Sequence, residues 1–172
     1  MARAALVDME PKAIVSAQSI AKTSGKWRYS SGSVVHAQSG SGNNWAQGYH
    51  SMSAMAGEKC EEAVRLETEA CDSFGGMVLL HSAAGGTGSG LGTFVSEAMR
   101  GLYPKAMMAN QVIWPHRTGG VIVQCYNAVL TLSHLQEVRE ESLQPNPNLV
   151  TAILLNPRSC VSQGLRRYIP NE

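Results

Sequence analysis

The sequence has little charge and no long apolar run, and each shortage excludes a class of protein. Only 16% of its 172 residues are charged and the net charge is +1, so it offers no electrostatic footprint for nucleic acid or for a membrane surface. No apolar stretch reaches the roughly 20 residues of a membrane helix, and the chain begins without an apolar signal region. We expect no nucleic-acid partner, no membrane partner, and a location in the cytoplasm or nucleus.

Cysteine is also scarce, and its spacing predicts no metal cage. The four cysteines lie at 60, 71, 125 and 160, and the five histidines at 36, 50, 81, 116 and 134. Neither set contains a CxxC or HxxxH pair of the kind that binds zinc. We expect reduced, buried cysteines, with a redox or metal role as the alternative.

What the sequence does contain is 44% hydrophobic residues and 17 glycines, which suits one folded domain of this length. Buried-strand runs are predicted at 4–7, 77–80 and 111–114, and helices at 11–22, 58–72, 91–102 and 121–138. The Ser-, Gly- and Asn-rich segment 23–50 is predicted to be a long loop. Strands that alternate with helices predict the α/β class, with a Rossmann-like parallel sheet and flanking helices.

Three segments carry further expectations. The first half of 121–138 is apolar nearly all round, which is typical of a buried helix. Glutamates form an acidic face on 58–72 that is either solvated or turned toward a partner. Beyond residue 142 prolines become frequent, and 149–155 is the last segment that could pair as a strand. Because the first strand starts almost at residue 1, we expect the chain to be either an unusually short domain or a piece of a larger protein.

A glycine-rich segment joins the strand at 77–80 to the helix at 91–102. It reads AGGTGSG over residues 84–90, at the end of a strand where an open α/β sheet binds its ligand. Glycines allow a close approach to phosphate, and the start of a helix attracts an anion. The segment lacks the lysine of GxxxxGK[ST], so we expect Asp8 and Glu10 to hold a Mg²⁺ that neutralises the outer phosphates. A tight connection without a ligand is the alternative.

Four segments, in the same order, resemble the tubulin superfamily: VDMEP at 7–11, SGSGNNWA at 39–46, HSAAGGTGSG at 81–90, and Tyr126-Asn127. The stretch 112–135 is more similar to the delta class than to the alpha or beta forms. The resemblance implies an incomplete tubulin nucleotide-binding domain over 1–142, followed by a divergent tail over 143–172. It implies GTP and Mg²⁺ as cofactors. The implied nucleotide-binding residues are Ser82, Ala84, Gly85, Gly86, Thr87, Gly88, Ser89, Gly90, Asp8, Gly42 and Asn43, and the implied metal ligand is Glu10.

Three nearby positions have competing interpretations. Asn43 and Asn44 fit a turn with side-chain caps as well as a phosphate site. Trp45 is expected to be a packing anchor rather than a base-stacking residue. Tyr126 and Asn127 are equally consistent with ordinary packing and polarity on a helix.

The resemblance further implies a GTP-binding structural protein of the microtubule cytoskeleton at centrioles or basal bodies. Its partners would be other tubulin subunits or centriolar microtubule proteins. A GTP-hydrolysing polymer subunit of another tubulin class, or an unrelated dinucleotide-binding domain, is the alternative. The family's first strand, guanine-reading asparagines and water-activating acidic loop have no match here. We therefore expect no catalytic residue, no GTPase activity from this chain itself, and marginal stability or association through an unpaired sheet edge.

Overall fold

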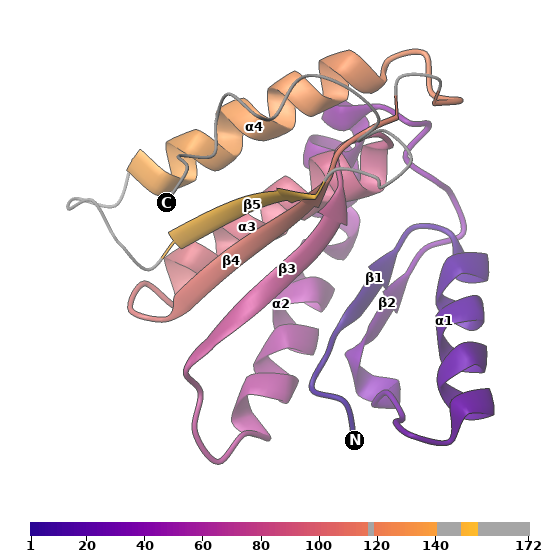
Figure 1. Ribbon diagram of the computed structural model, residues 1–172, viewed down its shortest axis with the longest axis vertical. Helices are drawn as coiled ribbons and strands as arrows, with labels where there is room; N and C mark the ends of the chain where they lie inside the picture. The colour runs from indigo at the N-terminus through magenta and orange to yellow at the C-terminus, as the bar shows by residue number, and fades with distance from the viewer. Residues whose placement is uncertain (117–118, 141–148, 155–172) are drawn as a thin grey trace, which may run out of the picture.

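Two parallel sheets form the frame of the molecule in the computed structural model, which describes residues 1–116, 119–140 and 149–154 (Figure 1). The first sheet pairs β1 (Leu6–Asp8) with β2 (Val34–His36). The second has the order β3-β4-β5, made of β3 (Gly76–Ser82), β4 (Met107–Ile113) and β5 (Leu149–Leu154). All of these pairings are parallel, so the α/β expectation is confirmed.

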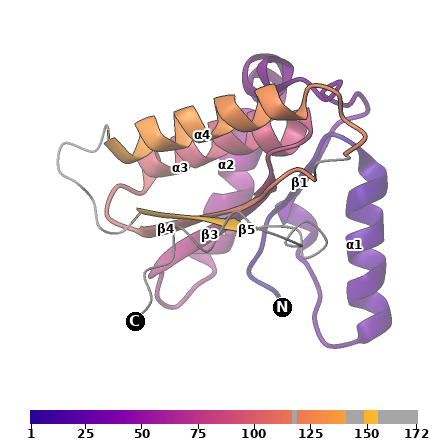
Figure 2. The same cartoon turned by 45° about the horizontal axis from the view of Figure 1, so that its top comes forward.

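Within the described residues, four α-helices connect and cover the strands: α1 (Pro11–Ser24), α2 (Ser53–Glu69), α3 (Gly92–Leu102) and α4 (Gln124–Glu140). Proline suits the start of α1 because its fixed φ matches a helix, and Gly25 ends that helix at φ 66°. Wide π-helical turns, Gln47–Met52 and Thr87–Leu91, precede α2 and α3. Figure 2 shows α3 and α4 over one face of the second sheet, with α1 standing beside the first.

The core lies between the helices and the inner face of each sheet. Along β4, Met108, Asn110 and Val112 are fully buried, whereas Met107 and Ile113 at its ends are exposed. Asn110 is satisfied there because its Nδ2 donates to Ser96 Oγ at 2.8 Å. No helix in the described part of the chain is long and apolar enough to cross a membrane.

The prediction of a loop over 23–50 was wrong in three places. A short 3-10 helix, Ser31–Ser33, and β2 lie inside that segment, and helical structure begins at Trp45, well before the predicted start at residue 58. β2 is only three residues long, too short to show a strand period. The helix start reads as loop because its Ser, Asn and Gly residues favour turns in the absence of tertiary contacts.

The helix predicted over 121–138 is confirmed as α4, but the prediction that its first half is buried was wrong. Ile122, Tyr126 and Val129 are 97%, 75% and 65% exposed, while the inward side of α4 includes the polar Asn127 and Thr131. Apolar residues all round cannot show which side of a helix packs. Here the hydrogen bonds of the polar residues decide it.

The glutamates of α2 divide into two groups. Glu62 and Glu69 are exposed and pair with Arg65, which agrees with a solvated face. Glu67 is different, because it is buried and accepts a hydrogen bond from Ser33 Oγ at 2.5 Å. Arg3 lies 3.5 Å from the same carboxylate.

Three cysteines are free thiols: Cys60 is buried, Cys71 half-buried and Cys125 exposed, so expected burial was wrong for Cys125. Burial raises the pKa of Cys60 to about 11. Cys160 lies outside the described residues. In the tail, β5 confirms the strand expected near 149–155, and residues 155–172 lie outside the described residues. The boundary between 142 and 143 stays a prediction.

Candidate phosphate-binding site

The site lies where β1 and β3 end. Asp8 is the last residue of β1 and Ser82 the last of β3. Both line one cavity of about 660 Å³, together with Thr87 and Gly88 from the turn that opens the α3 helix. Residues far apart in the sequence therefore line one cavity, although β1 and β3 belong to different sheets.

The start of the α3 helix supplies the chemistry for an anion. The helical turn begins at Gly86, and its first backbone bond runs from Ser89 N–H to Gly85 C=O at 3.3 Å. The N–H groups of a first turn have no partner within their helix, and they lie at the positive end of its dipole. Ser82 shapes the approach to this turn, since its Oγ accepts the Ala84 N–H at 3.2 Å. The arrangement fits a phosphate.

A second loop, residues 39–44, lies against the glycine-rich segment. Its Gly42 and Asn43 are consecutive left-handed residues, at φ 58° and 54°. The buried Ser41 hydroxyl lies 3.1 Å from Thr87 Oγ1. Asn44 Oδ1 accepts the Ala46 N–H at 2.9 Å, which confirms a side-chain cap at that residue. The two loops thus form one unit.

Asn127 of α4 connects the two loops. It is 3% exposed, and its Nδ2 donates to the Asn43 and Ala84 carbonyls, each at 2.8 Å. Its Oδ1 accepts the Trp45 N–H at 3.0 Å. All three partners are backbone atoms, so this one amide sets the spacing between the loops. Sequence reasoning left the role of Asn127 open. The feature that could have indicated it is a polar residue within a mostly apolar predicted helix.

Three glycines of the motif serve packing within the protein. A Cβ added to Gly86 would lie 2.5 Å from Ser41 Oγ, one on Gly88 would lie 2.6 Å from Ser82 O, and one on Gly90 would lie 2.2 Å from Trp45 O. None of the three has a positive φ. These glycines are therefore explained by close approach of the chain to itself, and their N–H contacts to phosphate stay a prediction.

Other residues of the motif occupy different positions. Gly85 is more open, since an added Cβ would meet only Asn43 Oδ1, at 3.3 Å. Ser89 is fully buried and its hydroxyl donates to the Gly85 carbonyl. Gly86, Ser89 and Gly90 are buried, whereas the other residues from Ala84 to Gly88 remain partly accessible.

Asp8 and Glu10 stand at the edge of the same site. Asp8 Oδ1 accepts the Glu10 N–H at 2.9 Å. The Glu10 carboxylate faces the second loop, because a Cβ added to Gly40 would lie 3.1 Å from its Oε1. The described residues hold no group of three or more metal-ligating side chains. Two carboxylates suit a Mg²⁺ that keeps water and phosphate oxygens as its other ligands, rather than a cage made by protein alone.

Two buried rings, those of His81 and Trp45, pack beside the glycine-rich segment. Burial lowers the pKa of His81, opposed by the Gly88 backbone, so the imidazole is neutral near pH 7. Trp45 is 5% exposed and stacks on Tyr49 and His134, with centroids 4.6 and 4.7 Å apart. The expectation that Trp45 is a packing anchor is confirmed.

Comparison with known proteins identifies the family of this chain. Residues 1–149 match the model of the Tubulin/FtsZ family, GTPase domain. The chain is 50% identical to the human tubulin delta chain over 135 residues, covering 78% of this chain and 30% of that one. The Macaca fascicularis delta chain is 49% identical with the same coverage, and the human tubulin beta-1 chain is 40% identical over 136 residues. The chain thus spans about 30% of the length of these relatives.

Proposed function

This chain belongs to the Tubulin/FtsZ family, and from that premise we propose that it binds the phosphates of GTP between its two loops, as a structural part of the microtubule cytoskeleton. The observation that carries the proposal is the Asn127 network, which fixes the loop at 39–44 beside the start of the α3 helix. A preformed concavity of N–H donors at a helix start is what a phosphate chain requires.

Within this proposal each residue that the sequence predicted for the site has a role. The Ser82 hydroxyl and the backbone from Ala84 to Gly88 surround the phosphates, and the buried Ser89 and Gly90 continue this turn into the helix. Gly42 and Asn43 close the opposite side. Asp8 and Glu10 hold Mg²⁺, which supplies the positive charge that the motif lacks for the outer phosphates. The parts of this chain bind and orient the phosphates; we assign none of them a bond-breaking step.

The identity to delta chains, 50% against 40% for a beta chain, favours a delta-type role. We place the protein in the cytoplasm and cytoskeleton, at centrioles or basal bodies, with the nucleus as a second location. Its proposed partners are other tubulin subunits or centriolar microtubule proteins. A GTP-hydrolysing subunit of another class is the second candidate, supported by the beta-chain similarity. Release of phosphate from pre-bound GTP by the purified chain would favour that candidate.

A pair of variants that differ only in charge tests phosphate binding. Ala84→Asp places a carboxylate beside the start of the α3 helix, whereas Ala84→Asn adds a side chain of equal size without charge. We expect Ala84→Asp to weaken GTP binding at least about tenfold relative to Ala84→Asn, through repulsion of the phosphates. Fluorescent GTP titrated with and without Mg²⁺, with ATP as competitor, measures this. Equal affinity of the two variants, or negligible GTP binding by the unchanged protein, would overturn the proposal.

A further inference from the structure

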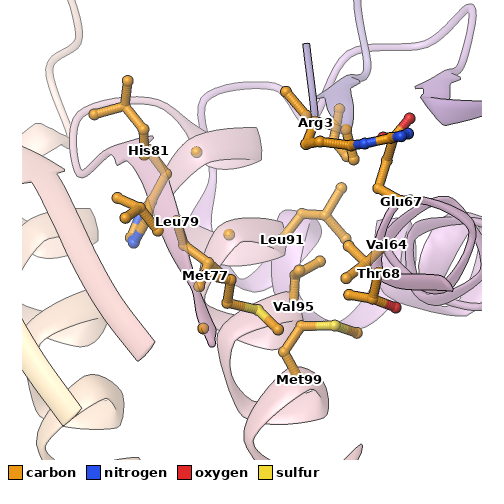
Figure 3. A pocket seen from close by; sticks show the side chains of 18 of the residues that line it. Arg3, Val64, Glu67, Thr68, Met77, Leu79, His81, Leu91, Val95 and Met99 are labelled. Atoms are coloured by element: carbon orange, nitrogen blue, oxygen red, sulfur yellow. The ribbon is translucent and has the colours of Figure 1, made fainter. Parts of the chain in front are cut away.

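A second, smaller cavity opens on the surface between the start of α2 and the adjoining face of α3. Its volume is about 300 Å³, and it shares no lining residue with the cavity of the candidate phosphate site, which Figure 3 shows. Three rings, a carboxylate, a hydroxyl and a methyl group line it, from Tyr49, His50, Phe94, Glu97, Ser53 and Ala98. All six residues belong to helical segments, so the backbone holds their side chains at a fixed spacing.

The rings of this cavity are held by packing. The Tyr49 ring stands at 84° to the His50 ring and at 81° to the Phe94 ring, with centroids 5.0 and 6.1 Å apart. Tyr49 also stacks on the buried Trp45, at 4.6 Å. Phe94 packs closely on Gly57 of α2, where an added Cβ would lie 2.9 Å from the Phe94 Cε1. Aromatic faces that are fixed in this way attract a cation, because the face of a ring carries negative charge.

Glu97 supplies a negative charge beside the rings. Its Oε2 accepts a hydrogen bond from the Tyr49 hydroxyl at 2.5 Å, and no lysine or arginine of the described residues forms an ion pair with it. By contrast, Glu67 in the larger cavity lies against Arg3 (Figure 3). Since an ionised carboxylate can accept about four hydrogen bonds, Glu97 has capacity for further donors.

The charges that follow the cavity along α2 are mostly of the same sign. Between Ser53 and Val64 the helix carries three glutamates and one lysine. Glu62 is paired with Arg65, whereas Glu58 is exposed and forms no ion pair within the part of the chain that the structure describes. A surface with excess carboxylates attracts a cationic group and repels an anionic one.

We propose that this cavity binds an arginine side chain of a partner protein, with the guanidinium plane against the aromatic rings and its N–H groups on the Glu97 carboxylate. Arginine suits the site better than lysine, because a planar guanidinium both stacks on rings and forks onto a carboxylate. A volume of about 300 Å³ lies at the lower end of the range for ligand pockets, so it suits one side chain. The inference uses none of the proposed phosphate-binding residues and therefore stands independently of GTP binding.

A single arginine is the direct probe. We would titrate the N-acetyl, N-methylamide derivative of arginine into the isotope-labelled full chain and follow the backbone amide signals of His50, Ser53 and Glu97 by NMR. We expect saturable shifts with a millimolar Kd, because one side chain makes few contacts. The citrulline derivative has nearly the same shape without the charge, and it should bind at least about fivefold more weakly. Equal binding of citrulline, equal binding of the lysine derivative, or no saturable shift with arginine would overturn the proposal.

Two substitutions locate the bound arginine. Glu97→Gln removes the charge of the cavity and should weaken binding at least about fivefold. Glu58→Gln removes the same charge from an exposed residue outside the cavity lining and should change binding less than about twofold. Circular dichroism confirms that each variant folds, and the comparison of arginine with citrulline stands if Glu97→Gln does not. An equal loss in the two variants would show general attraction by an acidic surface and would contradict the proposal, as would unchanged binding in Glu97→Gln.

Discussion

Asn127 shows how one side chain can organise a site that it does not form. Its amide donates to two carbonyls and accepts one N–H from two loops more than 40 residues away in sequence. Asn127→Asp replaces the Nδ2 donor by a second oxygen that faces those carbonyls. We expect it to lower the free energy of unfolding by about 2–4 kcal/mol, more than the 1–3 kcal/mol expected for Asn127→Ala.

Urea unfolding of the two variants measures this difference, with Tyr126→Ala as the matched control because Tyr126 is the exposed neighbour on the same helix. A smaller loss for Asn127→Asp than for Asn127→Ala would show that the two carbonyls do not depend on this amide.

His81 connects stability to pH at the same scale. Burial lowers its pKa below the ordinary value of 6.5, so the folded chain resists the proton that the unfolded chain accepts. The stabilisation is fully present above pH 6.5 and is lost as the pH falls from there toward the folded-state pKa. The slope should approach about 1.4 kcal/mol per pH unit.

The difference between pH 7.5 and 5.0 in urea unfolding tests this expectation. His81→Leu should flatten the profile, whereas His36→Gln, on the exposed end of β2, should leave it unchanged. A profile that stays equally steep in His81→Leu would assign the effect to other groups.

At the scale of elements, the two π-helical turns meet through glycine. A Cβ at Gly90 would lie 2.2 Å from the Trp45 carbonyl oxygen and 2.6 Å from the Tyr49 nitrogen, both backbone atoms that cannot move aside as a side chain can. Gly90→Ala should therefore cost more than about 2 kcal/mol of unfolding free energy. Gly101→Ala, in α3 with nothing within 4 Å, should stabilise by up to about 1 kcal/mol. Thermal unfolding of the two variants compares the positions. Equal effects on stability would show that close backbone packing does not explain the glycine at position 90.

The same contacts explain which elements sequence reasoning could predict. β3 was predictable because it contains a continuous apolar run, and α3 because its apolar residues repeat with the period of an amphipathic helix. The strand predicted at 111–114 found only the end of β4. β2, the early start at Trp45 and the orientation of α4 were not predictable, since each depends on a partner distant in sequence. That Asp8 and Ser82 line the same cavity was predictable from their positions at strand ends. The Asn127 connection was not, because no local pattern marks which carbonyls an amide will reach.

At the scale of the whole molecule, the candidate phosphate site lies where the two sheets approach each other. Asp8 belongs to the first sheet, and Ser82 and Thr87 to the second sheet and its helix. A ligand that contacts both parts binds only the folded arrangement, so it stabilises the chain by mass action. Because of this coupling, binding at the proposed nucleotide and metal sites can be measured as a gain in the free energy of unfolding.

Nucleotide should raise stability, and Mg²⁺ should account for part of the rise. GTP with Mg²⁺ at a hundredfold excess over Kd is expected to add about 2.7 kcal/mol to the free energy of unfolding. Glu10→Gln should fold as well as the unchanged chain, because Glu10 is exposed, but it should lose the Mg²⁺-dependent part of the gain. Glu58→Gln, an exposed glutamate of α2, should keep the full gain. Urea titrations with GTP, in Mg²⁺ or in EDTA, measure the total gain in unfolding free energy and the part of it that depends on Mg²⁺. If the gain in the unchanged chain is the same in EDTA as in Mg²⁺, Asp8 and Glu10 do not hold the metal, because a nucleotide bound through Mg²⁺ cannot stabilise equally without it.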